Sequence, residues 1–300
     1  LRAIHLEIWL RPMPRTIVFA HANGFPAGTY RRLFDAWRQA GWTVMAPEML
    51  GHDPTYPVSG NWSRLRDQLA DYVATHAPHP VALVGHSLGG LLSLLVACRR
   101  PELVGGLVML DSPVVIGWRA HSVRMLKASG LMQRFSPGRV SRARRYEWPT
   151  RQAALAHFAA KPTFARWAPG VLHDYIAAGT RRAGGRTVLA FDRMIETRIY
   201  DTVPHHFPRL LGRHPPRCPV GFIAGTRSQE MRLGGMDGSR RLAGERFRWI
   251  DGTHHYPMEK PDQTAALVLE LLDGMGLPAG ADRRTSQVRS GATPAQTRPV

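Results

Sequence analysis

A serine stands between glycines in the stretch Gly85-His86-Ser87-Leu88-Gly89. The residues before it, Pro80–Val84, are apolar like a buried strand, and those after it, Leu88–Arg99, are apolar like a buried helix. A sharp strand-to-helix turn of this pattern exposes the serine hydroxyl as a nucleophile. The Leu88 N–H at the helix start could then stabilise an oxyanion. The sequence predicts acyl transfer through Ser87; a tight turn that merely contains serine is the alternative.

The elements around this turn alternate between strand-like and helix-like patterns. Short apolar runs predict strands at Thr16–Ala20, Trp42–Ala46, Pro80–Val84, Leu107–Leu110, Val220–Ala224 and Phe247–Ile250. Helical spacing of apolar residues predicts helices at Tyr30–Ala40, Asn61–Thr75 (with Asn61 as N-cap), Leu88–Arg99 and Thr264–Leu272. Strands that alternate with helices indicate an α/β fold, with a mostly parallel sheet flanked by helices and joined by right-handed crossovers.

The alternation stops between residues 113 and 217, where helix-like, Arg-rich pieces are separated by proline and glycine. We therefore predict a core made of residues 13–112 and 218–276, interrupted by a helical insertion at 113–217. Residues 1–12 are predicted to be an N-terminal extension of uncertain structure. Residues 277–300 offer almost nothing to bury, which predicts a disordered tail.

The charge of the 300-residue chain is strongly basic, at +18. The segment 113–217 alone carries +14. Such a segment could attract an anionic substrate or an anionic surface, or it could be a solvated face that reflects a coding bias for arginine. It has no nucleic-acid-binding motif, so we expect no nucleic-acid partner. No apolar run is long enough to span a bilayer and no signal-peptide pattern precedes the first strand, so we expect a cytoplasmic protein.

The serine turn in its strand–helix context resembles that of the α/β-hydrolase superfamily, and the resemblance covers about residues 14–275. The loop His21-Ala22-Asn23-Gly24-Phe25-Pro26 is similar to the family's oxyanion loop, which implies the Phe25 N–H as a second oxyanion donor. The segment from Gly252 to Pro261 is similar to the family's G-x-H-x-x-P-x-E-x-P pattern. The match implies His254 as general base, with the adjacent His255 as its rival.

The acid that should orient this histidine departs from the common family pattern. Ser228 stands where the family usually has aspartate, and Glu230 follows two residues later. A second location within the superfamily is the end of the strand after the nucleophile helix, where this chain has Asp111. We favour Asp111 and keep Glu230 as the alternative; a carboxylate that only braces the loop is the competing reading of Asp111.

These residues together predict a serine hydrolase that cleaves a small-molecule ester or thioester, with the insertion as a cap over the pocket. The alternative is a non-hydrolytic or lyase-type member of the superfamily that binds an anionic ligand under the basic cap. The chemistry needs no cofactor, and the histidines of the insertion lack the spacing of a metal site. The sequence leaves the acyl group, the leaving group and the oligomeric state open.

Overall fold

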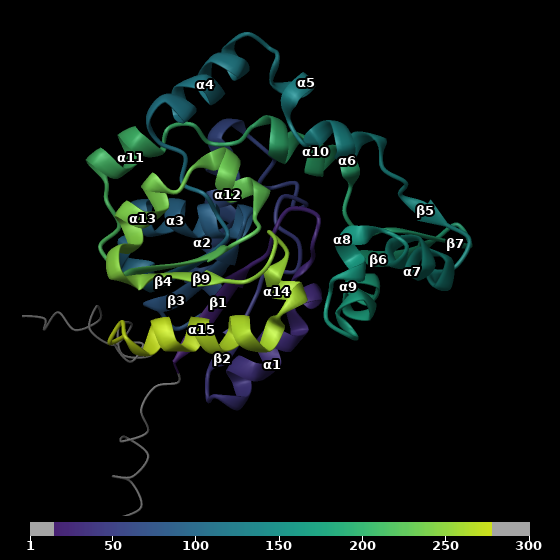
Figure 1. The fold of residues 1–300 in the computed structure, drawn as a ribbon, viewed down its shortest axis with the longest axis horizontal. Helices are drawn as coiled ribbons and strands as arrows, with labels where there is room; N and C mark the ends of the chain where they lie inside the picture. The colour runs from purple at the N-terminus through teal and green to yellow at the C-terminus, as the bar shows by residue number, and fades with distance from the viewer. Residues whose placement is uncertain (1–14, 278–300) are drawn as a thin grey trace, which may run out of the picture.

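The computed structural model describes residues 15–277 and contains a central sheet of six parallel strands (Figure 1). The strand order is β2-β1-β3-β4-β8-β9. The strands are β1 Thr16–Ala20, β2 Thr43–Met45, β3 Val81–His86, β4 Val104–Leu110, β8 Val220–Gly225 and β9 Phe247–Ile250. The predicted α/β fold class is confirmed. The extension predicted at 1–12, and the tail predicted at 277–300 apart from Leu277, lie outside the described residues.

The sheet separates two hydrophobic cores because successive side chains of a strand point to opposite faces. In β1, Ile17 and Phe19 pack with helices α1 and α15, whereas Val18 and Ala20 pack with α2 and α3. The helices are α1 Arg31–Gln39, α2 Ser63–His76, α3 Leu88–Arg99, α13 Asp237–Ala243 and α15 Pro261–Asp273. Both faces of the sheet are covered, as parallel sheets require.

The predicted N-cap at Asn61 is wrong. Helix α2 begins at Ser63, and Asn61 lies in the preceding 3-10 turn, η3 (Gly60–Trp62), with a left-handed φ of 56°. Asparagine tolerates that conformation better than most residues. Its side-chain oxygen accepts a hydrogen bond from Lys127 Nζ of the insertion at 3.1 Å instead of capping the helix.

The chain between β4 and β8 forms an insertion that is mainly helical. Figure 1 shows helices α4 and α5 at one end of it, and α7–α9 with a small sheet beside the core. Its helices are α4 Gly117–Ala128, α5 Met132–Phe135, α6 Gly138–Ala143, α7 Arg151–Ala159, α8 Pro162–Ala165, α9 Val171–Gly179, α10 Arg193–Asp201 and α11 Phe207–Arg213. The described residues include no helix long and apolar enough to cross a membrane.

The small sheet corrects the expectation of a purely helical insertion. Strands β5 (Glu147–Trp148), β6 (Thr180–Ala183) and β7 (Arg186–Leu189) pair antiparallel in the order β5-β7-β6. Strands β6 and β7 are joined by Gly184 and Gly185, whose φ angles of 54° and 74° are positive. A two-residue turn with two positive φ angles matches the twist of a hairpin. The short strands rich in arginine gave no apolar pattern to reveal them.

The start of the insertion is fastened to the core. The Val114 N–H donates to Ser239 Oγ of α13 at 3.1 Å, and both residues are fully buried. A Cβ at Gly238 would lie 2.2 Å from Val114 O, so the two segments can approach this closely only because residue 238 is glycine. Helix α13 therefore holds the chain just after β4 in place.

Candidate active site

Ser87 lies at the turn between β3 and α3, at the carboxyl end of the sheet. Its backbone is strained, with φ 54° and ψ −115°. The neighbouring glycines make the turn possible, because a Cβ at Gly89 would lie 1.9 Å from Ala20 O and one at Gly85 would lie 2.4 Å from Gly89 O. The Ser87 N–H donates to Leu110 O at 2.9 Å, which ties the turn to β4. Such strain is found where a side chain must be held in a reactive position.

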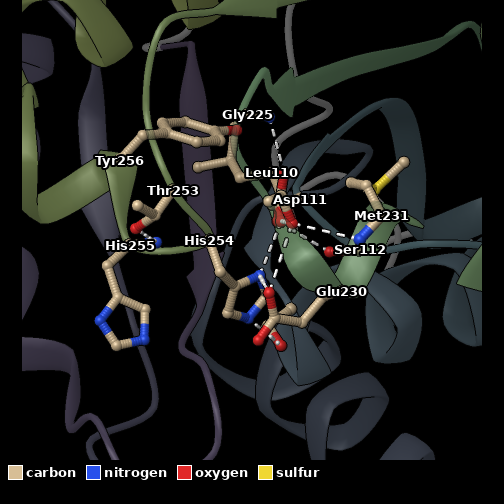
Figure 2. Close-up of polar contacts among 12 residues, drawn as sticks. Leu110, Asp111, Ser112, Gly225, Glu230, Met231, Thr253, His254, His255 and Tyr256 are labelled. Carbon is tan, nitrogen blue, oxygen red and sulfur yellow. Dashed lines mark hydrogen bonds and ion pairs between the residues drawn. The ribbon is translucent and has the colours of Figure 1, made fainter. Parts of the chain in front are cut away.

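His254 lies between Ser87 and Asp111. His254 Nε2 is 3.0 Å from Ser87 Oγ, and His254 Nδ1 is 2.7 Å from Asp111 Oδ2. Because a carboxylate can only accept, Nδ1 carries the proton and Nε2 is left to accept the serine hydroxyl hydrogen. Figure 2 shows the His254 ring turned toward Asp111 and the His255 ring turned away. The structure thus brings together the predicted serine, histidine and aspartate.

Asp111 is held in a fully buried position at the end of β4. Its Oδ1 accepts the Gly225 N–H at 2.7 Å, and its Oδ2 accepts the Ser228 hydroxyl at 2.5 Å as well as His254 Nδ1–H. The Asp111 backbone has a positive φ of 46°, and its N–H donates to Ile223 O at 2.9 Å. Three hydrogen bonds to the carboxylate and one from the backbone therefore hold Asp111 beside His254.

Glu230 lies farther from the histidine than Asp111 does. It is in the first turn of α12 (Gln229–Gly234), and its Oε2 is 3.8 Å from His254 Nδ1. Its side chain is 47% exposed. The geometry makes Asp111 the hydrogen-bond partner of His254 and leaves Glu230 as a nearby second charge (Figure 2).

The two adjacent histidines differ in their electrostatic surroundings. Burial alone would lower the pKa of His254, but the hydrogen bond and charge of Asp111, with the charge of Glu230, outweigh it and raise this pKa above 6.5. Burial, with the charge of His254, lowers the pKa of His255 to about 3. His254 can therefore take up a proton during a reaction, while His255 stays neutral.

The two predicted oxyanion donors lie in different backbone settings, one at the start of a helix and the other in a loop turn. Leu88 is the first residue of α3, where backbone N–H groups have no acceptor within the helix. The Phe25 N–H donates to Ala22 O at 3.1 Å within its own loop. The ring of Phe25 packs against Trp167 and Tyr175 of the insertion, with centroids 5.8 and 5.6 Å away. For Phe25 to serve an oxyanion, its N–H must exchange this carbonyl for the substrate oxygen.

A cavity of about 620 Å³ adjoins His254 between the core and the insertion. Thr163 and Arg166 line it from the insertion, and the loops after β8 and β9 line it from the core. All the residues that line it have polar side chains: Thr163, Arg166, Arg227, Gln229, Glu230, Thr253, His254 and His255. This cavity can receive a polar part of a substrate.

The carboxylates around His254 also form the one group of possible metal ligands among the described residues. One atom each of Asp111, Glu230 and His254 lies within 4.8 Å of the others. The oxygens of Asp111 and the nitrogens of His254 already have partners in the chain to Ser87. The arrangement therefore suits proton transfer better than metal binding.

Sequence reasoning did not single out two buried residues beside this chain. The Tyr30 hydroxyl lies 2.7 Å from His86 Nδ1, and His86 Nε2 lies 2.9 Å from the carbonyl of His254. Tyr30 was predicted as an apolar position of a helix, but α1 begins at Arg31. No sequence signal links residues so far apart in the chain.

Comparisons with known proteins identify the family of this chain. The model of the alpha/beta hydrolase family matches residues 17–267. Mouse (Mus musculus) monoglyceride lipase is 32% identical over 111 residues, which are 34% of this chain and 36% of the lipase. The chain thus matches only about a third of the length of that relative.

Solved structures share the fold over most of the chain. E-2-(acetamidomethylene)succinate hydrolase superposes with a TM-score of 0.66 and 19% identity, covering 87% of this chain and 91% of its own. The M. tuberculosis esterase Rv0045c gives a TM-score of 0.62 with 22% identity, covering 88% and 86%. The family model spans well over half of the described residues. The chain therefore belongs to the alpha/beta hydrolase family.

Proposed function

We propose that this protein is a serine hydrolase that cleaves a small-molecule ester or thioester through an acyl-enzyme on Ser87. The observation that carries the proposal is the continuous chain from Ser87 through His254 to Asp111, with contacts of 3.0 and 2.7 Å. The names lipase and esterase of the mouse and M. tuberculosis relatives favour an ester substrate over an amide.

In the first half-reaction, Ser87 Oγ attacks the acyl carbonyl carbon and His254 Nε2 takes the hydroxyl proton. The Leu88 N–H stabilises the resulting oxyanion, and the Phe25 N–H does so after leaving Ala22 O. His254 then gives its proton to the leaving alcohol or thiol as that bond breaks. In the second half-reaction, His254 takes a proton from water as the water attacks the acyl carbon, and returns that proton to Ser87 Oγ as the acid leaves.

Asp111 supports both steps and stays ionised throughout. Its carboxylate keeps His254 Nδ1 protonated and stabilises the imidazolium that forms each time. The non-hydrolytic alternative was motivated by Ser228, which stands where the family usually has aspartate. Asp111, at 2.7 Å from His254, supplies that carboxylate from another strand and supports hydrolysis instead.

We propose that the insertion is a cap and that the preferred substrate carries a negative charge. Trp167 and Tyr175 of the insertion pack against Phe25 of the oxyanion loop. Arg166 is an exposed cation on the wall of the polar cavity, and no acid of the described residues pairs with it. The basic insertion would also steer an anion toward this opening. The cytoplasmic location expected from the sequence is retained as a proposal.

The test is covalent labelling with a fluorophosphonate probe, followed by peptide mass mapping. We expect an adduct on Ser87 that is absent in Ser87→Ala. We expect hydrolysis of p-nitrophenyl esters by the wild type and not by that variant. A folded wild-type protein that neither labels at Ser87 nor cleaves any ester or thioester offered would overturn the proposal.

A further inference from the structure

A buried hydrogen-bond chain runs from the oxyanion loop to the backbone of the general base. The Ala22 N–H donates to the Tyr30 hydroxyl at 3.3 Å, and Tyr30 lies 2.7 Å from His86 Nδ1. His86 Nε2 lies 2.9 Å from the carbonyl oxygen of His254. Tyr30 is 2% exposed and His86 is fully buried. The chain links three segments that meet at Ser87: the oxyanion loop, the end of β3 and the loop after β9.

The direction of each hydrogen bond follows from the groups involved. The carbonyl oxygen of His254 can only accept a hydrogen bond. His86 Nε2 therefore carries a hydrogen and donates a hydrogen bond to that oxygen. In neutral His86, Nδ1 is then an acceptor, and the Tyr30 hydroxyl donates to it. The Tyr30 oxygen accepts in turn from the Ala22 N–H. Tyr30 thereby sets the tautomer of His86.

His86 must stay neutral for His254 to work, because the two ring centroids are only 4.9 Å apart. Each half-reaction places a positive charge on His254, and a second cation beneath it would oppose that step. Burial, with the charges of His254 and His255, lowers the pKa of His86 well below its ordinary value. Tyr30 acts in the same direction, since a protonated Nδ1 would leave the tyrosine hydroxyl hydrogen without an acceptor in a buried place.

We propose that Tyr30 and His86 are positioning residues that hold the His254 backbone in place and keep the ring beneath the general base neutral. They act through His254, because their side chains bond to each other, to the oxyanion loop and to the His254 carbonyl, while the Ser87 hydroxyl bonds to the His254 ring. The inference rests on the proposed function, because positioning of His254 matters only if His254 activates Ser87.

Tyr30→Phe removes only the hydroxyl and is the first test. We expect the rate constant for fluorophosphonate labelling of Ser87 to fall roughly five- to tenfold, the size of one lost hydrogen bond. The loss should grow as the pH is lowered, because His86 can then take a proton at Nδ1. The groups that face His86 are Tyr30 on the 3-10 helix η2 (Ala27–Tyr30) and His254 and His255 on the loop after β9. A merely structural role would lower the rate equally at every pH.

Tyr72→Phe is the matched control, since it removes a half-buried tyrosine hydroxyl on α2, which bonds to the Ala46 backbone. It should label at the wild-type rate. His86→Gln, which keeps an N–H able to reach the His254 carbonyl, should label faster than His86→Leu. A Tyr30→Phe protein that labels like the wild type at all pH values would overturn the proposal.

The tautomer of His86 can be read directly, without any activity. Long-range ¹H–¹⁵N spectra of the wild type should show a histidine protonated at Nε2 and not at Nδ1, identified by its loss in His86→Gln. A His86 ring protonated at Nδ1 would contradict the proposal, and so would a His86 ring that carries both protons at neutral pH. If the wild type fails to label at Ser87, the proposed function fails, whereas the spectra still decide the state of His86.

Discussion

Ser228 donates its hydroxyl hydrogen to Asp111 Oδ2 across 2.5 Å, from the position at which the family usually carries the acid. The two residues are 117 positions apart in the chain. Ser228 also accepts the Met231 N–H at 3.1 Å and so caps α12. The residue at the usual acid position thus braces the carboxylate that comes from β4. The side chains at the two positions from which the acid could come, 111 and 228, are therefore in direct contact.

This contact predicts that the carboxylate can be moved from residue 111 to residue 228. Asp111→Asn should lower kcat on the order of 10³- to 10⁴-fold, because an amide can donate to His254 and favours the wrong tautomer. Adding Ser228→Asp to that variant should restore kcat by at least about tenfold, since Ser228 Oγ lies 2.5 Å from Asp111 Oδ2, the atom that bonds to His254 Nδ1. Steady-state kinetics on a p-nitrophenyl ester measures both. Ser129→Asp in the same background is the control and should restore nothing; equal recovery by both would contradict the argument.

Glu230 should shift the pH dependence of the reaction rather than its maximum rate. His254 must be neutral to accept the Ser87 proton, and its pKa is raised in part by Glu230. Glu230→Gln removes that contribution, so the pKa falls and the acid limb of kcat/KM moves to lower pH. The measurement is the pH profile beside Glu245→Gln, an exposed change that should leave the limb in place. A limb that moves to higher pH would show that Glu230 acts in another way.

The elements around the site and the choice of its acid show what the sequence alone could and could not predict. The runs Thr16–Ala20 and Leu88–Arg99 predicted β1 and α3 to the residue, because buried elements require nearly continuous apolar side chains. The choice between Asp111 and Glu230 stayed open, because it depends on which carboxylate the packing of β4 against β8 brings to His254. Ser228 was noticed only as a substitution, and its hydrogen bond to Asp111 requires coordinates.

Arg166 should contribute to the preference for an anionic substrate. Arg166→Ala should raise KM for mono-p-nitrophenyl succinate by up to about fivefold, since one exposed charge pair contributes about 1 kcal/mol or less. The neutral p-nitrophenyl butyrate should be cleaved as before. Arg182→Ala, an exposed arginine on β6, is the matched control. An equal change in KM for both esters would argue against recognition of charge in the cavity.

The serine turn should not tolerate a side chain at Gly89. A methyl group there would lie 1.9 Å from Ala20 O, a backbone atom of β1. Gly89→Ala should therefore lower the free energy of unfolding by about 4 kcal/mol or more. Gly212→Ala in α11 meets no atom within 4 Å and should raise that free energy by up to about 1 kcal/mol. Urea denaturation of the two variants measures the contrast, and similar midpoints would refute it.

Acid should weaken the fold through its buried neutral histidines. Burial, with the charge of His52, lowers the pKa of His21 to about 4, against a backbone hydrogen bond that raises it. The unfolded chain takes up this proton near pH 6.5 and the folded chain does not, so stability falls as the pH drops below that value. His21 alone then costs about 2 kcal/mol at pH 5.

The measurement is the urea midpoint at pH 7 and pH 5. His21→Gln should show a smaller loss between the two pH values than the wild type, and the exposed His121→Gln should show the same loss as the wild type. His254, with its raised pKa, acts in the opposite sense, and the comparison of variants removes its contribution. A His21→Gln protein with an unchanged dependence on pH would rule out His21 as the source.

The hydrogen bond from the Val114 N–H to Ser239 Oγ bears on how far the insertion can change without moving Asp111. Because the chain is anchored there, three residues beyond Asp111, the carboxylate and the proposed cap are held in place by different contacts. Exchange of the segment between Val114 and Val220 for one of another shape and charge would leave the carboxylate where it is. In this fold, the proposed cap can therefore vary in shape and charge while the residues beside Ser87 stay in place.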